Sequence, residues 1–435
     1  MNRLSSLAMS LVLVSVLSAQ TVSVKTMTLQ QAINAALQNN YSVTSAQNAL
    51  TSSQAGVTAS YGKFLPTVSG SVGWSGSNTT TPLGSGSSTG ASVGVAANVT
   101  LFNGFSNFAG LDKSRAVARS TEQDLYRTRQ SIVSLTQQSY LQVLRNKSLL
   151  AVYQENLKQS NQQLDRIVES NKVGAVAIAD VYRQQATTAK DELTVIQAQN
   201  AYDNSKADLL YLVALDVTQE YDFVDESITN EIGKLENADT THQTVDINQL
   251  MAQALNDRPD YQSMVLRKSS AESDVTIARS GHMPSLFGNA GYSMGNTSFS
   301  NMSDIKTWSY GLTLSIPLFS GFQTSTNVQI AELALDNADQ ALDQERRLVQ
   351  KDLKQAVLNL ESARKQVEVS QKGVVSSLED RKTAQEKYSL GASTLLDLLV
   401  ANANYVTAEN GKVNAEYDYL YYQQQLKLAI GKDRY

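Results

Sequence analysis

The 435-residue chain contains no cysteine, and histidine occurs in it only twice. The absence of cysteine excludes disulfides, thiolate metal sites, cysteine nucleophiles and a lipid on an N-terminal cysteine. His242 and His282 lie in different segments without other ligands at metal-binding spacing, so we expect no metal site and no cofactor. No set of serine, histidine and acid stands out either, which indicates a protein that is not an enzyme.

Positive charge is also scarce, because 36 basic residues stand against 41 acidic residues and give a formal net charge of −5. A nucleic-acid-binding surface needs clustered lysine and arginine. We therefore expect no nucleic-acid partner.

Long apolar runs are nearly absent, and the exception is the N-terminus. Arg3 precedes an apolar run over residues 4–17, and the small residues Ser18 and Ala19 follow it. This pattern is typical of an export signal over residues 1–19, with cleavage after Ser18 or Ala19. A membrane anchor is the alternative, but the run is shorter than the about 18 to 20 apolar residues that a spanning helix needs.

The chain repeats itself, since residues from about 28 to 216 return in order as residues from about 246 to 433. The offset is constant: 318 − 101, 391 − 174, 397 − 180 and 433 − 216 all equal 217. We predict a first repeat over 20–216, an irregular acidic segment over 217–245 and a second repeat over 246–435. Such elongated units bury their apolar faces by packing side by side.

Each repeat begins with a helical pattern, from Thr28 to about Tyr61 and from Ile247 to about Gly281. Pro66 and Pro284 then end the helical character, and the apolar period changes to two. This predicts strand pairs over about 66–102 and about 284–319. The stretches 76–90 and 295–306 are small and polar, so we expect them to be exposed loops.

Apolar and polar residues alternate along the predicted strands, and this alternation indicates what each face of the sheet contacts. Every second residue from Trp308 to Leu318 is large and apolar, and those between are small or polar up to Ser315. A soluble sheet with one face on a core gives the same pattern. A lipid-facing barrel is favoured, because aromatic residues would form a girdle toward one end of the strands: Trp74, Tyr292, Trp308 and Tyr310. Four strands cannot close a useful barrel, so several chains would contribute.

Two long helices follow the strands, over about 106–172 and about 323–389, where proline is absent and helix formers dominate. Roughly 65 residues at about 1.5 Å each give a rod of about 100 Å. Gly174 and Gly391 mark matching turns, and second helices run back from about Ala177 to Leu215 and from Ser393 to Ile430. The fold class is thus mainly α with a small β part, built as a duplicated strand pair plus long helical hairpin.

Three motifs carry a family resemblance. They are the first turn with its flank, residues 173–181, the second, residues 388–399, and the strand-to-helix corner Pro317–Phe322. Over essentially its whole mature length, the chain resembles the TolC-like outer-membrane efflux proteins, also called outer membrane factors. The resemblance implies a homotrimer in the outer membrane of a Gram-negative bacterium, where about twelve strands close one β-barrel continuous with a periplasmic α-helical barrel. It further implies a passive exit duct of an efflux or secretion system, docked to a periplasmic adaptor protein and an inner-membrane pump.

The same resemblance assigns roles at the hairpin turns. Asp180 and Tyr388 match positions that hold the resting tip closed, and Asp397 would form a ring of three carboxylates in the lumen. A second Asp common in the family is replaced here by Val400, and a common Arg by Ser393, which predicts weaker cation block. Both Asp180 and Asp397 can also be read as helix N-terminal carboxylates favoured by the helix dipole.

The exposed turns are expected to meet the adaptor, with turn chemistry alone as the alternative reading. The residues concerned are Val173, Gly174, Ala175, Leu390, Gly391 and Ala392. An exported structural or adhesive coiled coil would also explain the long helices, but such a fibre has no use for a lipid-facing band. A simple diffusion porin would not need the rods.

Overall fold

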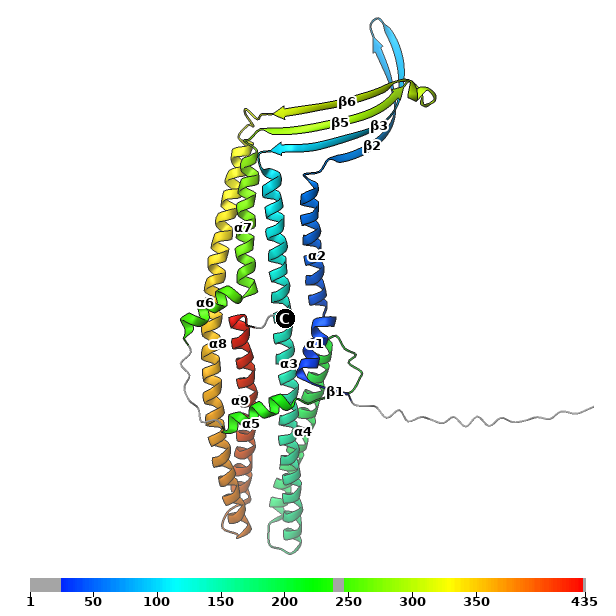
Figure 1. Ribbon diagram of the computed structural model, residues 1–435. Coiled ribbons are helices and arrows are strands. Elements are labelled where there is room, and N and C mark those ends of the chain that lie inside the picture. Colours follow the sequence, from blue (N-terminus) through cyan, green and yellow to red (C-terminus); the bar gives the residue numbers. More distant parts are fainter. Residues whose placement is uncertain (1–24, 238–245, 433–435) are drawn as a thin grey trace, which may run out of the picture.

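Long helices joined to one small sheet dominate the computed structural model, which describes residues 25–237 and 246–432 (Figure 1). The predicted export signal, residues 1–19, lies outside the described residues. The first copy comprises α1 (Leu29–Asn39), α2 (Tyr41–Gly62), β2 (Thr67–Thr81), β3 (Gly84–Asn103), α3 (Ser106–Lys172) and α4 (Ile178–Leu212). The second comprises α6 (Ile247–Asp257), α7 (Pro259–Ser280), β5 (Ser285–Asn296), η1 (Phe299–Asp304), β6 (Lys306–Ser315), α8 (Gln323–Ser389) and α9 (Leu395–Ile430).

The predicted duplicated unit is confirmed. The α3–α4 and α8–α9 hairpins point away from the sheet side by side, and α3 and α8 each run for 67 residues (Figure 1). At the sheet end, α2 accompanies α3 and α7 accompanies α8. Helix-forming residues and the absence of proline let α3 and α8 continue unbroken.

The single helix predicted at the start of each repeat is wrong, because both copies contain a break. Asn40 leaves the helical conformation with ψ 130°, and its side chain caps α2 by accepting a bond from the Ser42 N–H at 2.9 Å. In the second copy, Pro259 is the first residue of α7, and Arg258 before it is extended with ψ 121°. Proline disfavours the helical conformation in the preceding residue, which explains this second break.

The predicted loop over 76–90 is also wrong. β2 and β3 continue as a ribbon to a turn at residues 82–83, with Thr81 paired with Gly84. Polar cross-strand contacts line this extension, as between the Ser77 and Ser88 hydroxyls at 3.0 Å. A two-stranded ribbon in water needs no apolar face to complete its backbone ladder, so low hydrophobicity misled the prediction. The other predicted loop, 295–306, contains the short helix η1 between its strand ends.

The segment between the repeats is not irregular throughout, which corrects that prediction. β4 (Tyr221–Phe223) pairs in parallel with β1 (Lys25–Met27), and α5 (Glu226–Asn237) follows. Phe223 is fully buried against Tyr140 of α3, whose hydroxyl donates to the Met27 carbonyl at 2.8 Å. This small element therefore closes the main hydrophobic core, which lies at mid-height between α1, α3, α4 and α9.

The four-stranded sheet is antiparallel in the order β2-β3-β5-β6. Its register sets apolar residues opposite one another, with Trp308 across from Tyr292 and Leu314 across from Leu286. Trp308 and Leu312 are 77% and 73% exposed, so this face covers no core within the chain. In the described part of the chain, β2 and β6 each have one free edge.

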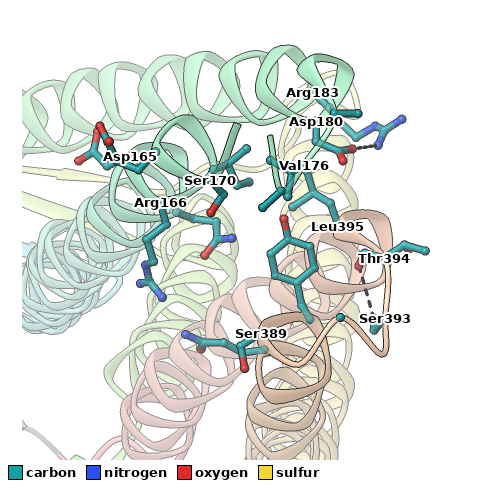
Figure 2. Close-up of a pocket in the computed structure, with 18 of the residues that line it drawn as sticks. Asp165, Arg166, Ser170, Val176, Asp180, Arg183, Ser389, Ser393, Thr394 and Leu395 are labelled. Carbon is teal, nitrogen blue, oxygen red and sulfur yellow. Dashed lines mark hydrogen bonds and ion pairs between the residues drawn. The ribbon is translucent and has the colours of Figure 1, made fainter. Parts of the chain in front are cut away.

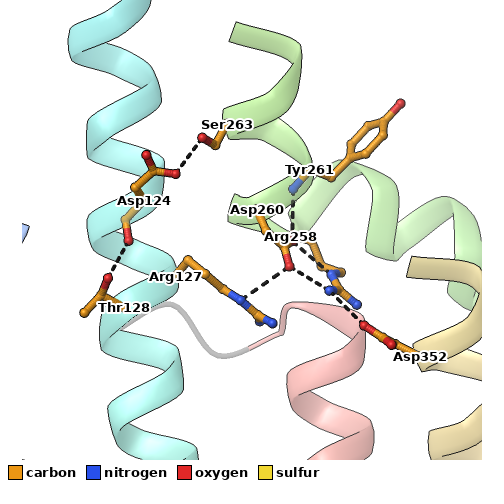
Figure 3. Close-up of polar contacts among 8 residues, drawn as sticks. All are labelled: Asp124, Arg127, Thr128, Arg258, Asp260, Tyr261, Ser263 and Asp352. Carbon is orange, nitrogen blue, oxygen red and sulfur yellow. Dashed lines mark hydrogen bonds and ion pairs between the residues drawn. The ribbon is translucent and has the colours of Figure 1, made fainter. Parts of the chain in front are cut away.

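Ion pairs join the two copies along the seam between α3 and α7 (Figure 3). Arg258 is only 2% exposed and donates to both oxygens of Asp260, at 3.0 and 2.6 Å, and to Asp352 of α8 at 3.3 Å. Arg127 of α3 lies 3.3 Å from the same Asp260. Ion pairs of the buried Arg258 and of Asp260 thus attach the break between α6 and α7 to both long helices, α3 and α8. None of the described helices is both long and apolar enough to cross a membrane.

Candidate functional site at the helical tips

The two hairpin turns share one backbone motif. Gly174 and Gly391 adopt the left-handed conformation, with φ 75° and 72°, which glycine reaches without steric cost. The next residue then bonds back across the turn, Ala175 N–H to Ser170 at 2.9 Å and Ala392 N–H to Lys387 at 2.8 Å. This is the Schellman ending of a helix, and it satisfies carbonyls that the helix leaves free. It leaves Val173 and Leu390 80% and 83% exposed at the extreme ends of the hairpins.

A small apolar cluster holds the two tips together. Ile167 and Val181 of the first hairpin and Leu395 of the second are each at most 6% exposed. Tyr388 and Val176 pack against them. We call this set the tip cluster, defined by Ile167, Val168, Val176, Val181, Tyr388, Leu395 and Leu399. Because it is small and isolated from the main core, the tips are joined weakly compared with the middle of the molecule.

A groove of about 1410 Å³ lies between the tips, next to this cluster (Figure 2). Both charge signs line it: the acids are Asp165, Glu169, Asp180 and Glu386, and the bases are Arg166, Arg183 and Lys382. The structure therefore brings two expected gate residues, Asp180 and Tyr388, and two expected adaptor-facing residues, Ala175 and Gly391, to one groove.

Asp180 lies in the first turn of α4 and pairs with Arg183, with 2.8 Å between Oδ1 and Nη1 (Figure 2). Among the described residues, no hydrogen bond joins Asp180 to Tyr388. Partial burial, and then the negative charge of Asp180, raise the pKa of the Tyr388 hydroxyl and so keep it protonated. The sequence analysis did not name Arg183 as a site residue. Its position three residues after Asp180 on a helix is nevertheless typical of an ion pair.

Asp397 has a different local role, although it matches Asp180 in the repeat. It completes a capping box at the start of α9, where its Oδ2 accepts from the Thr394 N–H at 3.0 Å and hydroxyl at 2.8 Å. The hydrogen bonds from Thr394, and then from Ser393, lower the pKa of this exposed carboxyl. The spacing of Thr394 and Asp397 is that of a capping box and could have predicted this arrangement.

The expected aromatic girdle lies at the other end of the molecule. Trp74 pairs with Ala91, four residues farther from the helices than Val95, which is the partner of Tyr292, and Tyr292 in turn lies directly opposite Trp308. Tyr310 is two residues nearer the helices. The Tyr292 and Trp308 rings contact each other with centroids 4.7 Å apart. In the described residues, no group of three or more His, Cys, Asp or Glu could hold a metal ion.

Comparison with known proteins identifies the family to which the two copies belong. The sequence profile of the family described as "Outer membrane efflux protein" matches residues 32–214 and 250–432, which are the two copies. The chain belongs to the outer membrane efflux protein family. The protein is therefore an outer membrane channel for efflux, with its helical part in the periplasm.

Similar proteins of the family include two from other bacteria. The outer membrane protein TolC of Vibrio cholerae is 26% identical over 336 residues, 75% of this chain and 73% of its own length. The outer membrane efflux protein BepC of Brucella suis is 24% identical over 406 residues, 93% of this chain and 85% of its own. The Campylobacter jejuni CmeC outer membrane channel has the same fold, with a TM-score of 0.81 at 19% identity, over 93% of this chain and 85% of CmeC.

Proposed function

We propose that this efflux protein is the homotrimeric exit duct of a tripartite efflux or secretion system. The observation that carries the proposal is the sheet, whose apolar face is exposed and whose edge strands β2 and β6 lack outer partners in the described chain. Three chains with four strands each supply about twelve strands, within the range of outer-membrane barrels. The α-hairpins of the three chains would then continue the barrel into a periplasmic tunnel.

The proposed duct is passive and carries no enzymatic activity. An inner-membrane pump selects the cargo, and both drug efflux and one-step protein secretion fit a duct of this kind. The partners are therefore a periplasmic adaptor protein, a pump and the lipid of the outer membrane.

The hairpin tips form the proposed gate and docking surface. The tip cluster, to which Tyr388 belongs, holds the two hairpins of one chain together in the resting state, and the Asp180 carboxylate lines the groove beside it. The exposed turns around Gly174 and Gly391 would receive the adaptor, since Val173 and Leu390 offer apolar side chains at the ends of the hairpins. Asp397 would face the lumen with its two symmetry mates and attract cations.

The test is extraction and reconstitution of the mature protein. We expect it to require detergent for extraction, to migrate with the mass of three chains and to conduct ions across a planar bilayer. Crosslinking in cells should recover an adaptor and a pump with it. A monomer that stays in solution without detergent would contradict the proposal and favour an exported structural coiled coil.

A further inference from the structure

At the sheet end of the molecule, the two copies meet along one joint. In the sheet, β3 of the first copy pairs with β5 of the second, and next to the sheet α3 packs against α7. The outer positions belong to β2 and α2 on one side and to β6 and α8 on the other (Figure 1). Each outer element has a counterpart inside the joint, because β2 and α2 repeat as β5 and α7, and β3 and α3 repeat as β6 and α8.

The repeat converts one observed strand pairing into another. Residues through β2 recur at an offset of 218, as for Pro66 and Pro284, and residues from β3 onward recur at 217. β2 pairs with β3 so that Thr67 lies opposite Asn98. The two offsets turn this pair into residues 285 and 315, and the structure does pair Ser285 with Ser315. The offsets therefore transfer a register from one pair of elements to its counterparts.

We infer that β6 and α8 of one chain join β2 and α2 of the next chain in the register that β3 and α3 keep with β5 and α7. This inference rests on the proposed trimer and specifies the surfaces through which its chains meet. The pair of Ala97 and Ala290 then becomes Leu314 of one chain and Val72 of the next. Both belong to the apolar face of the sheet, whereas a slip by one residue would turn the apolar residues of one strand to the other face.

A proline at the end of β6 supports this register. The pairing of β3 with β5 is irregular and shifts between Thr100 and Phe102. At the offset of 217, this place corresponds to Pro317 and Phe319. Proline lacks the N–H that a ladder needs, and within sheets it occurs at edges and bulges. Pro317 therefore falls where the transferred register interrupts the ladder.

The helices continue the same joint. Within the chain, Ser120 of α3 and Ser263 of α7 are 4% and 1% exposed, and their hydroxyl oxygens lie 3.0 Å apart. Their counterparts at the two offsets are Asn337 of α8 and Ser45 of α2, and both are exposed in the described chain. A neighbouring chain in the transferred register would cover these two positions as the second copy covers Ser120.

The joint between chains differs in chemistry from the joint within the chain. Lys113 of α3 pairs with Asp274 of α7 at 2.7 Å. The counterparts are Ile330, which is 60% exposed, and Gly56, where a Cβ would meet nothing within 4 Å in the described chain. α2 carries no charged residue. An apolar side chain on α8 thus has a small, uncharged position opposite it, so the occupant that fits each surface is a second copy of this chain.

Cysteine pairs test the register, because the chain has no thiol of its own. Asn337→Cys combined with Ser45→Cys should form disulfides between chains when detergent-purified trimers are treated with copper phenanthroline. Gel electrophoresis without reducing agent then shows species with the mass of two and three chains. Ser120→Cys combined with Ser263→Cys is the matched reference, since it should close a disulfide within the chain and keep the mass of one chain.

A displaced pair controls for the register. Ser52 lies on the same face of α2 as Ser45, seven residues or about 10 Å further along the helix. Asn337→Cys combined with Ser52→Cys should therefore leave the chains unlinked.

The sheet offers an independent pair. Leu314→Cys combined with Val72→Cys should be linked between chains. Tyr310→Cys combined with Val72→Cys is displaced by four residues, or about 13 Å, and should not be linked. Because the sheet and the helices are tested separately, an assembly defect in one variant leaves the other to decide.

The outcomes separate this inference from the proposed function. Suppose that the trimers conduct and that the reference pair forms its disulfide. A predicted pair that then stays unlinked, or that links less efficiently than its displaced control, overturns the register and leaves the proposed duct intact. If the unaltered protein forms no trimer and no conductance, the proposed function fails and the joint between chains fails with it.

Discussion

At the residue scale, Asp180 and Asp397 occupy equivalent positions of the two copies but make different local contacts. Asp180 follows Ala177, which cannot cap α4, and it pairs with Arg183. Asp397 follows Thr394, and its Oδ2 is engaged in the capping box. Two neighbouring positions thus decide whether the carboxylate serves an ion pair or a helix cap, because the second copy has Thr394 in the place of Ala177 and Val400 in the place of Arg183. A cap does not exclude a lumenal role, since all three hydrogen bonds to Asp397 fall on Oδ2.

Asp397→Asn tests the lumenal role. The amide retains an acceptor oxygen for Thr394, so the cap is largely kept while the charge is removed. We expect block of the channel by divalent or trivalent cations to weaken, as measured by single-channel conductance. Asp180→Asn is the matched control. Equal block in Asp397→Asn and the unaltered protein would place Asp397 outside the lumen.

The pH dependence of cation block follows from the same contacts. Hydrogen bonds from Thr394 lower the pKa of Asp397 below the ordinary value of 3.8, so the carboxylate stays charged at that pH. Cation block should therefore persist as the pH falls to about 4 and weaken only below it. Conductance titrations with a trivalent cation measure this. Loss of block near pH 5 would mean either that repulsion among the three Asp397 carboxylates outweighs these hydrogen bonds or that another group binds the cation.

Arg258 is the residue whose loss should cost the most stability. Burial by itself raises the pKa of Asp260, but the bonds from Arg258 and the charge of Arg127 outweigh it and lower that pKa. Arg258→Ala leaves the Asp260 carboxylate short of its main partner, which should cost about 3 to 5 kcal/mol. Thermal unfolding of the detergent-solubilised protein at neutral pH measures the effect, which should shrink in acid as Asp260 becomes protonated.

Arg267→Ala is the control for this prediction. Arg267 also pairs with a carboxylate across the seam, Asp124 at 2.7 Å, but its side chain is 52% exposed. Exposed pairs contribute about 0 to 1 kcal/mol. Similar losses in the two variants would contradict the special role given to the buried cluster.

At the element scale, the corner between strand and helix repeats in sequence but not in packing. Gly104 and Gly321 both have positive φ, 63° and 58°, so an alanine costs about 1 to 2 kcal/mol at either position. A Cβ at Gly104 would also come within 2.7 Å of the Met283 Cβ and 2.8 Å of the Ser280 carbonyl oxygen. At Gly321 it would meet nothing within 4 Å in the described chain.

Gly104→Ala should therefore be the more damaging of the two substitutions. The overlap adds about 1 to 3 kcal/mol, as for other overpacked sites. Yield and thermal stability of the detergent-extracted protein would show the difference from Gly321→Ala. If Gly321→Ala were equally harmful, a contact made only in the assembly would be crowding that corner.

At the scale of the whole molecule, the proposed barrel places the apolar face of the sheet against lipid and the other face against the water of the lumen. Leu312 and Thr313 are neighbours on β6, halfway between the strand end at Ser315 and the level of Trp308. Their side chains point to opposite faces. Leu312→Arg on the apolar face should cost about 2 to 4 kcal/mol at the middle of the bilayer, whereas Thr313→Arg on the lumenal face should be tolerated.

The amount of heat-stable assembly in isolated outer membranes measures both variants. Leu312→Arg should reduce it strongly, and Thr313→Arg should leave it near the level of the unaltered protein while changing ion selectivity. The reverse order would mean that the apolar face of the sheet is turned away from lipid.

The sequence alone determined the features that depend on local pattern. The repeat offset, the strand alternation and the proline-free helical stretches follow from periods of two and 3.6 residues and from backbone chemistry. They predicted α3 and α8 over residues 106–172 and 323–389, as the structure has them. The motifs around Gly174 and Gly391 then led to the family.

The tertiary structure decided what depends on partners distant in the chain. The ribbon of β2 and β3 beyond Trp74 is held by backbone pairing. Its side chains are small and polar, so their pattern did not predict strands there. The pairing of β4 with β1 and the burial of Arg258 both depend on segments tens to hundreds of residues away. Local pattern fixes which face of an element is apolar, but only packing decides what that face meets.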